Sequence, residues 1–292
     1  IAGYEYAGEK PFTNVYLTGL VRDKQRRKMS KSLGNSPEPL ELIEKFGADG
    51  VRVGLLLSAS AGNDIMFDEE LCNQGKGFSN KIWNAFKLIK GWEVSETIPQ
   101  PESSKVAIEW YEAKLQQALA EIEDNFEKYR ISDALMGIYK LVWDDFCSWY
   151  IELSKLHLTG DDEVAKKSAL NTLVYVLNTI VRLLHPIMPF VTEEIYQAIP
   201  HKEESIVISK WPEVNPEYDN DTINDQFAYL IDIIKGVREI RHTYVIKNSI
   251  EVDYTITTKQ DDLEALLKEI APYVSKLVNA TCVGYNVPTS KN

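Results

Sequence analysis

The sequence predicts a mainly α-helical fold, in which an antiparallel helix bundle lies between a short strand-and-loop segment and a small α/β unit. From residue 68 to about residue 200, apolar residues recur at helical spacing with short links between the segments. The first 35 residues instead combine a β-branched run with a basic loop, and the last 90 mix strand-like and helical patterns. A chain of 292 residues is long enough for roughly two domains.

The N-terminal elements are predicted from local signals. Residues 14–21 are rich in β-branched and aromatic side chains and predict a strand, which a polar loop at 22–35 follows. Ser36 and the two prolines after it are typical of a helix start, and Gly47 is typical of a helix end. We therefore expect one short helix before Gly47 and a second over 49–58.

The central part of the chain predicts the bundle. Prolines 186 and 189 interrupt the helical pattern before a short helix at 192–196. Aromatic residues at 143, 146 and 150 have the spacing of one helix face, so we assign them to the core. The four long helices are expected at 68–92, 106–128, 131–158 and 161–184.

The last 90 residues predict the small α/β unit. Strands are expected at 205–209, 249–257 and 281–285, where apolar and polar residues alternate or nearly do so. Helices are expected at 223–241 and 261–271.

The charge of the chain argues against a nucleic-acid partner only if it is taken as a sum. The chain has 32 Lys and Arg against 44 Asp and Glu, a net charge of −12. Residues 1–34, however, carry seven basic and three acidic groups, and residues 71–92 carry four lysines and no acid. Local potential matters more than the sum, because salt screens charges beyond about 8–10 Å.

Other compositional features exclude several classes of protein. No apolar run reaches the roughly 18 residues that a membrane helix needs, so no membrane association is expected. The three cysteines lie far apart and form no CxxC pair, which favours a reducing compartment and predicts no metal site. The first residue is Ile1 and not Met, so we expect an internal piece of a longer protein.

The basic loop carries the clearest chemical signal. Lys28 and Lys31 bracket Met29 and Ser30 in a loop after the predicted strand, and Gly34 permits a tight turn close to a ligand. Two ammonium groups at this spacing can surround a polyphosphate and follow the charge that develops on leaving pyrophosphate. A solvated basic loop is the alternative for a generic Lys- and Ser-containing string.

The full string resembles a known family. Residues 28–32 (Lys-Met-Ser-Lys-Ser) match the second signature of the class I aminoacyl-tRNA synthetases, and their flanks resemble the Val/Ile/Leu subgroup. The strings at 47–52 and 185–195 resemble the same subgroup. The strings at 62–68 and 80–85 are similar to those of the valine enzymes within it.

The resemblance implies a domain order. The chain would contain the end of a Rossmann-like catalytic domain, connecting helices that contact the tRNA stem, the class I anticodon-binding helix bundle and a small α/β unit. The expected boundaries are 1–35, 36–70, 71–204 and 205–292.

The resemblance also implies an activity, that of a valine–tRNA ligase of the cytoplasm. Such an enzyme uses ATP, with Mg²⁺ expected in the full enzyme, and the matching catalytic residues are Lys28 and Lys31. Its His-x-Gly-His signature and its editing domain are absent from these residues, so this chain alone is predicted to be inactive. The implied partners are tRNA(Val) and the upstream catalytic and editing domains of the same polypeptide. The segment expected to contact ATP is Lys28, Met29, Ser30, Lys31 and Ser32.

The first long helix predicts a tRNA-binding face. Lys76, Lys87 and Lys90 fall within a sector of roughly 60° on a helical wheel, with Trp83 among them. Lysines neutralise phosphates and an indole can stack on an unpaired base. A solvated helix face with Trp83 half-buried in the core is the alternative. With the residues that the family resemblance adds, the expected tRNA contacts are Lys76, Asn80, Lys81, Trp83, Lys87 and Lys90.

Three questions stay open at the sequence level. A second basic group on the helix at 223–241 could contact tRNA or dock the bundle onto the rest of an enzyme; it consists of Lys235, Arg238, Arg241 and His242. The chain could also be a stand-alone tRNA-binding module derived from a synthetase. Finally, it could come from an isoleucine–tRNA ligase.

Overall fold

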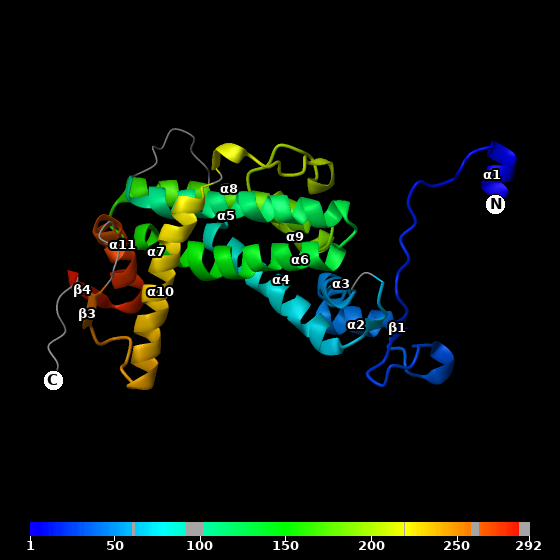
Figure 1. Ribbon diagram of the computed structural model, residues 1–292, viewed down its shortest axis with the longest axis horizontal. Coiled ribbons are helices and arrows are strands. Elements are labelled where there is room, and N and C mark those ends of the chain that lie inside the picture. The colour runs from blue at the N-terminus through cyan, green and yellow to red at the C-terminus, as the bar shows by residue number, and fades with distance from the viewer. Residues whose placement is uncertain (60–61, 92–101, 219, 258–262, 286–292) are drawn as a thin grey trace.

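The computed structural model describes residues 1–59, 62–91, 102–218, 220–257 and 263–285. Long helices form a bundle, with the N-terminal segment reaching away from one end and a small α/β unit at the other (Figure 1). The predicted fold class is therefore confirmed. None of the helices in these ranges is long and apolar enough to cross a membrane.

The N-terminal segment does not form the predicted strand. Helix α1 (Ala2–Ala7) is followed by an extended stretch with exposed side chains, of which Leu17 is 78% exposed. Only β1 (Val21–Arg22) pairs, in parallel with β2 (Ile65–Met66). A strand needs neighbours for its backbone hydrogen bonds. Among the described residues, the Ile65 N–H donates to the Leu20 carbonyl at 2.9 Å, but residues 14–19 have no such partner, so the prediction of a strand over 14–20 is wrong.

Two short helices connect the signature loop to the bundle. Helices α2 (Pro39–Phe46) and α3 (Ala48–Leu57) confirm the predictions for this region. Gly47 ends α2 with φ 78° and allows the chain to turn directly into α3. Ser36 is not the helix cap that the sequence predicts. Glu38 occupies that position without a side-chain cap hydrogen bond, because Pro39 is the first helical residue.

The predicted bundle is confirmed helix by helix. Asp68 and Asp162 cap two of its helices by accepting hydrogen bonds from backbone N–H groups of the first turn. The bundle consists of α4 (Glu69–Ile89), α5 (Glu102–Glu127), a helical run over 131–158 and α8 (Glu163–Leu184).

The run over 131–158 has the predicted extent but not uniform winding. It divides into α6 (Ile131–Lys140), the π-helix η2 (Leu141–Tyr150) and α7 (Ile151–Leu158). In η2 the Ser148 hydroxyl donates to the Trp143 carbonyl, five residues earlier, at 2.8 Å. π-helical segments of this length are rare.

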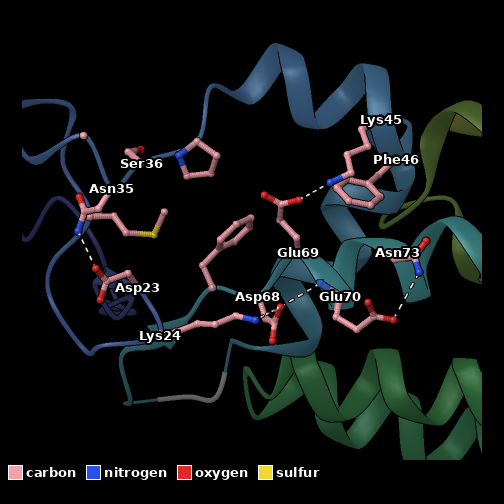
Figure 2. Close-up of a pocket in the computed structure, with 14 residues that line it drawn as sticks. Asp23, Lys24, Asn35, Ser36, Lys45, Phe46, Asp68, Glu69, Glu70 and Asn73 are labelled. Carbon is pink, nitrogen blue, oxygen red and sulfur yellow. Dashed lines mark hydrogen bonds and ion pairs between the residues drawn. The ribbon is translucent and has the colours of Figure 1, made fainter.

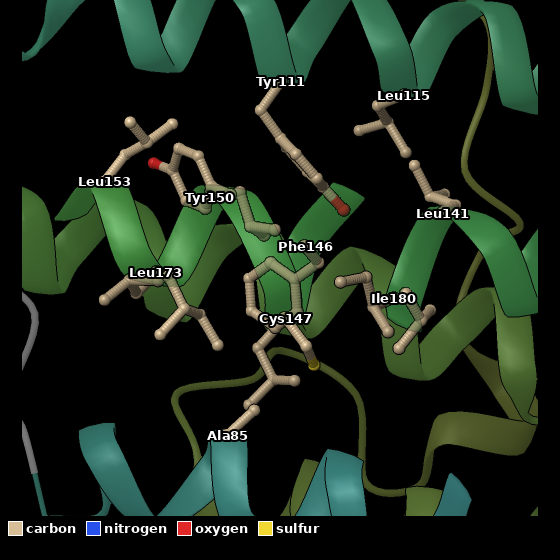
Figure 3. Close-up of a cluster of buried hydrophobic side chains, with 14 of the residues drawn as sticks. Ala85, Tyr111, Leu115, Leu141, Phe146, Cys147, Tyr150, Leu153, Leu173 and Ile180 are labelled. Carbon is tan, nitrogen blue, oxygen red and sulfur yellow. The ribbon is translucent and has the colours of Figure 1, made fainter. Parts of the chain in front are cut away.

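Aromatic side chains of η2 lie at the centre of the core (Figure 3). The Tyr111 ring of α5 lies 5.8 Å from the Phe146 ring and 4.8 Å from the Tyr150 ring, centroid to centroid. Both η2 residues are buried, as predicted, while Trp143 is only partly buried against the core. Leu173 and Ile180 of α8 close the cluster from the opposite side (Figure 3).

The C-terminal part forms the expected α/β unit. Helix α9 (Pro189–Ala198) packs against α8 and α4, and α10 (Asp221–Thr243) packs across α5. Strands β3 (Val252–Ile256) and β4 (Ala280–Tyr285) pair in parallel and are connected by α11 (Leu263–Val278). Short 3₁₀ helices, η3 (Ile206–Ile208) and η4 (Pro216–Tyr218), lie between α9 and α10.

The strand predicted at 205–209 is wrong, because η3 occupies these residues. The Ser205 hydroxyl accepts from the Val207 N–H at 3.3 Å and donates to the Glu193 carboxylate at 2.9 Å, which closes a turn. Ile206 is buried, but Val207 is exposed. The alternating pattern therefore reflects one buried anchor in a turn and not a sheet.

Candidate functional site

The loop between β1 and α2 is built around one carboxylate. Asp23 accepts hydrogen bonds from the backbone N–H groups of Gln25 and Arg27, and it also pairs with the Arg27 guanidinium at 2.7 Å. The Asn35 amide donates to Asp23 at 3.0 Å and is the main reason why the pKa of this carboxyl falls from 3.8 to about 2. Asp23 is therefore ionised at neutral pH and holds both ends of the loop.

Asn35 closes the loop, a role that its place in the string at 26–35 does not predict. Its side-chain oxygen accepts from the Ser30 N–H at 2.9 Å. Its NH₂ group donates to Asp23 and, at 3.2 Å, to the Lys28 carbonyl. One amide thus fixes the backbone on both sides of Met29.

The two signature serines shape the turn. Ser30 precedes the 3₁₀ helix η1 (Lys31–Leu33), and its hydroxyl accepts from the Leu33 N–H at 3.3 Å. The hydroxyls of Ser30 and Ser32 lie 3.2 Å apart, within hydrogen-bonding distance. Gly34 then reverses the chain with φ 64°. Both hydroxyls thus have a partner inside the turn.

The signature lysines remain exposed on this fixed loop. Three neighbouring cations are ion-paired: Arg22 with Asp64, Lys24 with Asp68, and Arg27 with Asp23. Lys28 and Lys31 are exposed and have no carboxylate partner among the described residues. Two unpaired ammonium groups on a loop with a fixed backbone are suited to binding a polyanion.

A cleft of about 800 Å³ lies beside the loop (Figure 2). Met29 and Asn35 contribute to its wall from the loop, whereas Lys28 and Lys31 do not. Its two lysines are ion-paired, Lys24 with Asp68 at 3.0 Å and Lys45 with Glu69 at 2.6 Å. Its lining also includes Asp23 and Glu70, so the cleft is acidic and is not suited to binding a polyanion.

Helix α4 brings five of the six predicted tRNA contacts to one face. Lys76, Asn80, Lys87 and Lys90 are exposed along it, and Trp83 is half-buried with its ring 5.1 Å from the Phe86 ring. The Lys76 ammonium donates to the Lys45 carbonyl at 2.9 Å, which fixes its position.

Lys81 lies apart from that face. Its ammonium stands 4.9 Å from the centroid of the Trp143 ring on η2, and the Trp143 ring stacks on the Tyr139 ring at 5.5 Å. Through this cation–π contact, Lys81 lies where α4 packs against the π-helix η2.

The second basic group, on α10, contains one buried and three exposed side chains. Arg241 is only 3% exposed and donates to the carbonyls of Lys247, Ile250 and Asn279, so it is a structural residue. Lys235, Arg238 and His242 are exposed. The guanidinium of Arg238 lies 5.9 Å from the Trp149 ring.

Two residues of the string at 47–52 dock α3 onto the turn before α9. The buried Asp49 carboxylate accepts from the Val191 N–H at 2.7 Å, and the Arg52 guanidinium donates to the Ile187 carbonyl at 2.7 Å. Burial raises the pKa of Asp49, although both backbone N–H partners oppose this. The sequence located both strings but not this contact between them.

Two family models match the chain. The model described as "Anticodon-binding domain of tRNA ligase" matches residues 109–256, and the model "tRNA synthetases class I (I, L, M and V)" matches residues 1–68. The first match covers half of the chain. The chain therefore belongs to the tRNA ligases that carry this anticodon-binding domain.

The curated relatives are valine–tRNA ligases. The enzyme of Christiangramia forsetii is 53% identical over 287 residues, which are 98% of this chain and 32% of that protein. The enzyme of Geobacillus stearothermophilus is 40% identical over 98% of this chain and 33% of its own length. The chain thus spans about a third of the relatives it matches, and the resemblance predicted from the motifs is confirmed.

Solved structures agree on the fold. A LeuRS–tRNA–LeuAMS ternary complex from Agrobacterium radiobacter K84 matches with a TM-score of 0.56, 20% identity and coverage of 75% of this chain and 26% of that chain. Mycobacterium tuberculosis methionyl-tRNA synthetase in complex with methionyl-adenylate matches with a TM-score of 0.51, 20% identity and coverage of 66% and 40%.

Proposed function

We propose that the chain is the segment of a valine–tRNA ligase that carries the signature loop and the anticodon-binding bundle. The whole enzyme would join valine to ATP with release of pyrophosphate and then transfer valine to tRNA(Val). The names of the relatives and the two family models support this proposal. The chain alone would be inactive, and it would act in the cytoplasm together with the upstream catalytic and editing domains of the same polypeptide.

The observation that carries the proposal is the pair of exposed lysines on a loop fixed by Asp23 and Asn35. Lys28 and Lys31 would bind the phosphates of ATP, with Lys31 following the charge on the leaving pyrophosphate. Met29 would anchor the loop, while Ser30 and Ser32 would shape its turn. Mg²⁺ would arrive with the triphosphate, and we place none of its ligands in this chain.

The domain boundaries of the proposal are 1–35, 36–70, 71–204 and 205–292. The pairing of β1 with β2, at residues 65 and 66, supports a connecting unit that packs back onto the signature segment. The family model for the anticodon-binding domain matches residues 109–256 and so runs past the proposed boundary at 204.

The face of α4 would meet the anticodon loop of tRNA(Val). Lys76, Lys87 and Lys90 would neutralise phosphates, with Asn80 and Trp83 between them positioned for contacts to bases. Lys81 would contribute from the side, next to Trp143.

Pyrophosphate exchange by the full-length protein tests the role of the loop. We expect Lys31→Ala to slow valine-dependent exchange by about 100-fold, as loss of one charge-stabilising donor typically does, with tRNA affinity within about twofold of the wild type. Lys10→Ala, an exposed lysine of the same segment, serves as the control. A normal exchange rate for Lys31→Ala would refute the assigned role.

Salt-dependent tRNA binding tests the α4 face. Replacing Lys76, Lys81 and Lys87 by Ala should weaken the binding of tRNA(Val) and reduce the slope of log affinity against log salt by about 2–3. The charge-matched control replaces Lys166, Lys167 and Lys202 by Ala, away from α4. Equal effects of the two triple variants would remove this face from the tRNA-binding surface.

A further inference from the structure

The C-terminal end of α10 and the turn after it form a basic tip that the proposed surfaces do not include. We define the α10 tip as residues 235–250. In Figure 1 the lower half of α10 projects past the bundle and ends in this turn. The tip exposes three basic residues, Lys235, Arg238 and Lys247, and one acid, Glu239, while its fourth basic residue, Arg241, is buried. The whole chain has a net charge of −12. The tip is therefore a local positive patch on an acidic protein.

A buried arginine holds the tip rigid. The Arg241 guanidinium donates to the carbonyls of Lys247 and Ile250 in the turn, and to that of Asn279 at the start of β4. The Asn279 amide in turn donates to the Asn248 carbonyl at 3.2 Å. The turn is thus fixed to the β3–α11–β4 unit by side chains that do not reach the surface of the tip.

This rigid turn presents apolar side chains to solvent. Tyr244 is 72% exposed and Val245 is 86% exposed. Val245 also has φ 54°, a left-handed conformation that costs a β-branched residue about 1–3 kcal/mol. This conformation is that of a Schellman helix end, in which the Ile246 N–H donates to the Arg241 carbonyl at 2.8 Å, and it leaves Tyr244 and Val245 exposed at the end of α10.

We infer that the α10 tip is a second RNA-contacting surface, which binds an unpaired loop of the same tRNA that α4 contacts. Tyr244 stacks on an unpaired base, with His242 and Lys247 two and three residues from it in the chain. Lys235, about 13 Å further back along α10, binds a neighbouring phosphate. The inference rests on the proposed function, because the chain must bind tRNA for the surface to be used.

RNA fits this surface better than a protein partner does. The centres of protein interfaces are depleted in charged residues, whereas the tip presents three exposed cations, Lys235, Arg238 and Lys247, together with its apolar side chains. An exposed aromatic ring within a basic surface is the usual arrangement for single-stranded RNA. Arg238 extends the positive surface back to Trp149 on η2 and hence toward the bundle.

The charge of the tip is tested by the affinity of the 292-residue chain for a tRNA(Val) transcript over a range of salt concentrations. We expect Lys235→Ala with Lys247→Ala to weaken binding by about tenfold and to lower the salt slope by roughly 1.5. Both side chains are exposed. The control replaces Lys167 and Lys202, which are exposed away from the tip, and should stay within twofold of the wild type.

Stacking is tested at Tyr244. Tyr244→Ala should weaken binding about five- to tenfold, whereas Tyr244→Phe, which keeps the ring, should bind like the wild type. A photo-crosslinking residue at position 245 in the full-length protein should give an adduct with tRNA. An adduct with polypeptide alone would overturn the inference and assign the tip to a protein contact.

The outcomes separate this inference from the proposed function. If the α4 variants weaken binding while both the double lysine variant and Tyr244→Ala match the control, the tip inference fails and the proposed function stands. If the α4 variants also match their control, the proposed α4 surface fails. Equal melting temperatures of all variants, measured by circular dichroism, show that the differences are not due to unfolding.

Discussion

Asn35 organises the signature loop with a single side chain. It accepts from the Ser30 N–H and donates to Asp23 and to the Lys28 carbonyl, so it fixes the backbone that carries both lysines. The sequence identified the lysines from their string but could not show this amide as their support. That role depends on a hydrogen bond across twelve residues, to Asp23.

Asn35→Ala should loosen the loop without unfolding the protein. The Ser30 N–H loses its acceptor, so we expect its hydrogen exchange to become at least about tenfold faster, equivalent to roughly 1.4 kcal/mol of lost protection. Mass-spectrometric exchange of peptides covering the loop measures this. Asn80→Ala, on the exposed face of α4, should leave the loop unchanged, and unchanged exchange in Asn35→Ala would contradict the account.

Asp145 is a partly buried carboxyl in the π-helix, and burial raises its pKa from 3.8 to about 6. The folded protein therefore holds this proton more tightly than the unfolded chain does. The resulting stabilisation is fully present below about pH 4 and is lost as the pH rises through 6.

Asp145→Asn removes this titration. At pH 7 the free energy of unfolding of the variant should be higher than that of the wild type by about 1–2 kcal/mol, after allowing for the partial exposure of the side chain. At pH 4 the two proteins should differ little, because the wild-type carboxyl is then protonated. Urea unfolding at the two pH values measures the difference. Asp144→Asn, which alters the exposed neighbour, should show a smaller pH-dependent gain, because burial is the main cause of the raised pKa of Asp145 and the Asp144 charge a lesser one.

At the scale of elements, α3 and α4 approach closely through glycines. A Cβ atom on Gly54 would lie 2.6 Å from the Cys72 backbone nitrogen, and one on Gly75 would collide with the Gly50 carbonyl. Gly77, two residues further along α4, has open space around it. The contact between α3, which follows the signature loop and α2, and α4 of the bundle thus depends on the close approach of the two helix backbones.

Gly75→Ala and Gly77→Ala form a matched pair on one helix. The first should lower the free energy of unfolding by about 2–4 kcal/mol, because backbone must shift to admit the methyl group. The second should raise it by about 0.5–1 kcal/mol, because Ala favours the helix. Thermal or urea unfolding measures both, and equal effects would show that the helices do not touch as described.

Periodicity predicted the elements where local pattern decides the structure. The four long helices agree with the apolar spacing and the caps within a few residues. The π-helix η2 was not predictable, since its aromatic residues fit an α-helical face equally well. The predicted strand does not form over residues 14–20. A strand is stable only with neighbouring strands, and the local sequence does not specify these.

The same limit applies to site residues. Helical spacing grouped Arg241 with Lys235 and Arg238, but Arg241 is buried because it binds carbonyls from distant turns. Spacing also placed Lys76, Lys87 and Lys90 on one face of α4, and the structure has them there.

At the scale of the whole molecule, charge separates the working surfaces from the rest. The signature loop, the α4 face and the α10 tip are basic, while the chain as a whole has a net charge of −12. The remaining surface is therefore acidic and would repel RNA from other faces. Asp49 and Arg52 of α3 bind the start of α9 and the turn before it, and α3 also packs against α4, so the connecting helix and the α4 face belong to one packed body.

The central claim, that this body recognises tRNA(Val), is tested most directly by one comparison. The affinities of the 292-residue chain for tRNA(Val) and tRNA(Ile) transcripts are measured side by side at the same salt concentration. The account predicts tighter binding of tRNA(Val), by about tenfold or more, since each discriminating base contact contributes about 1–3 kcal/mol. Equal affinity, or a preference for tRNA(Ile), would contradict it.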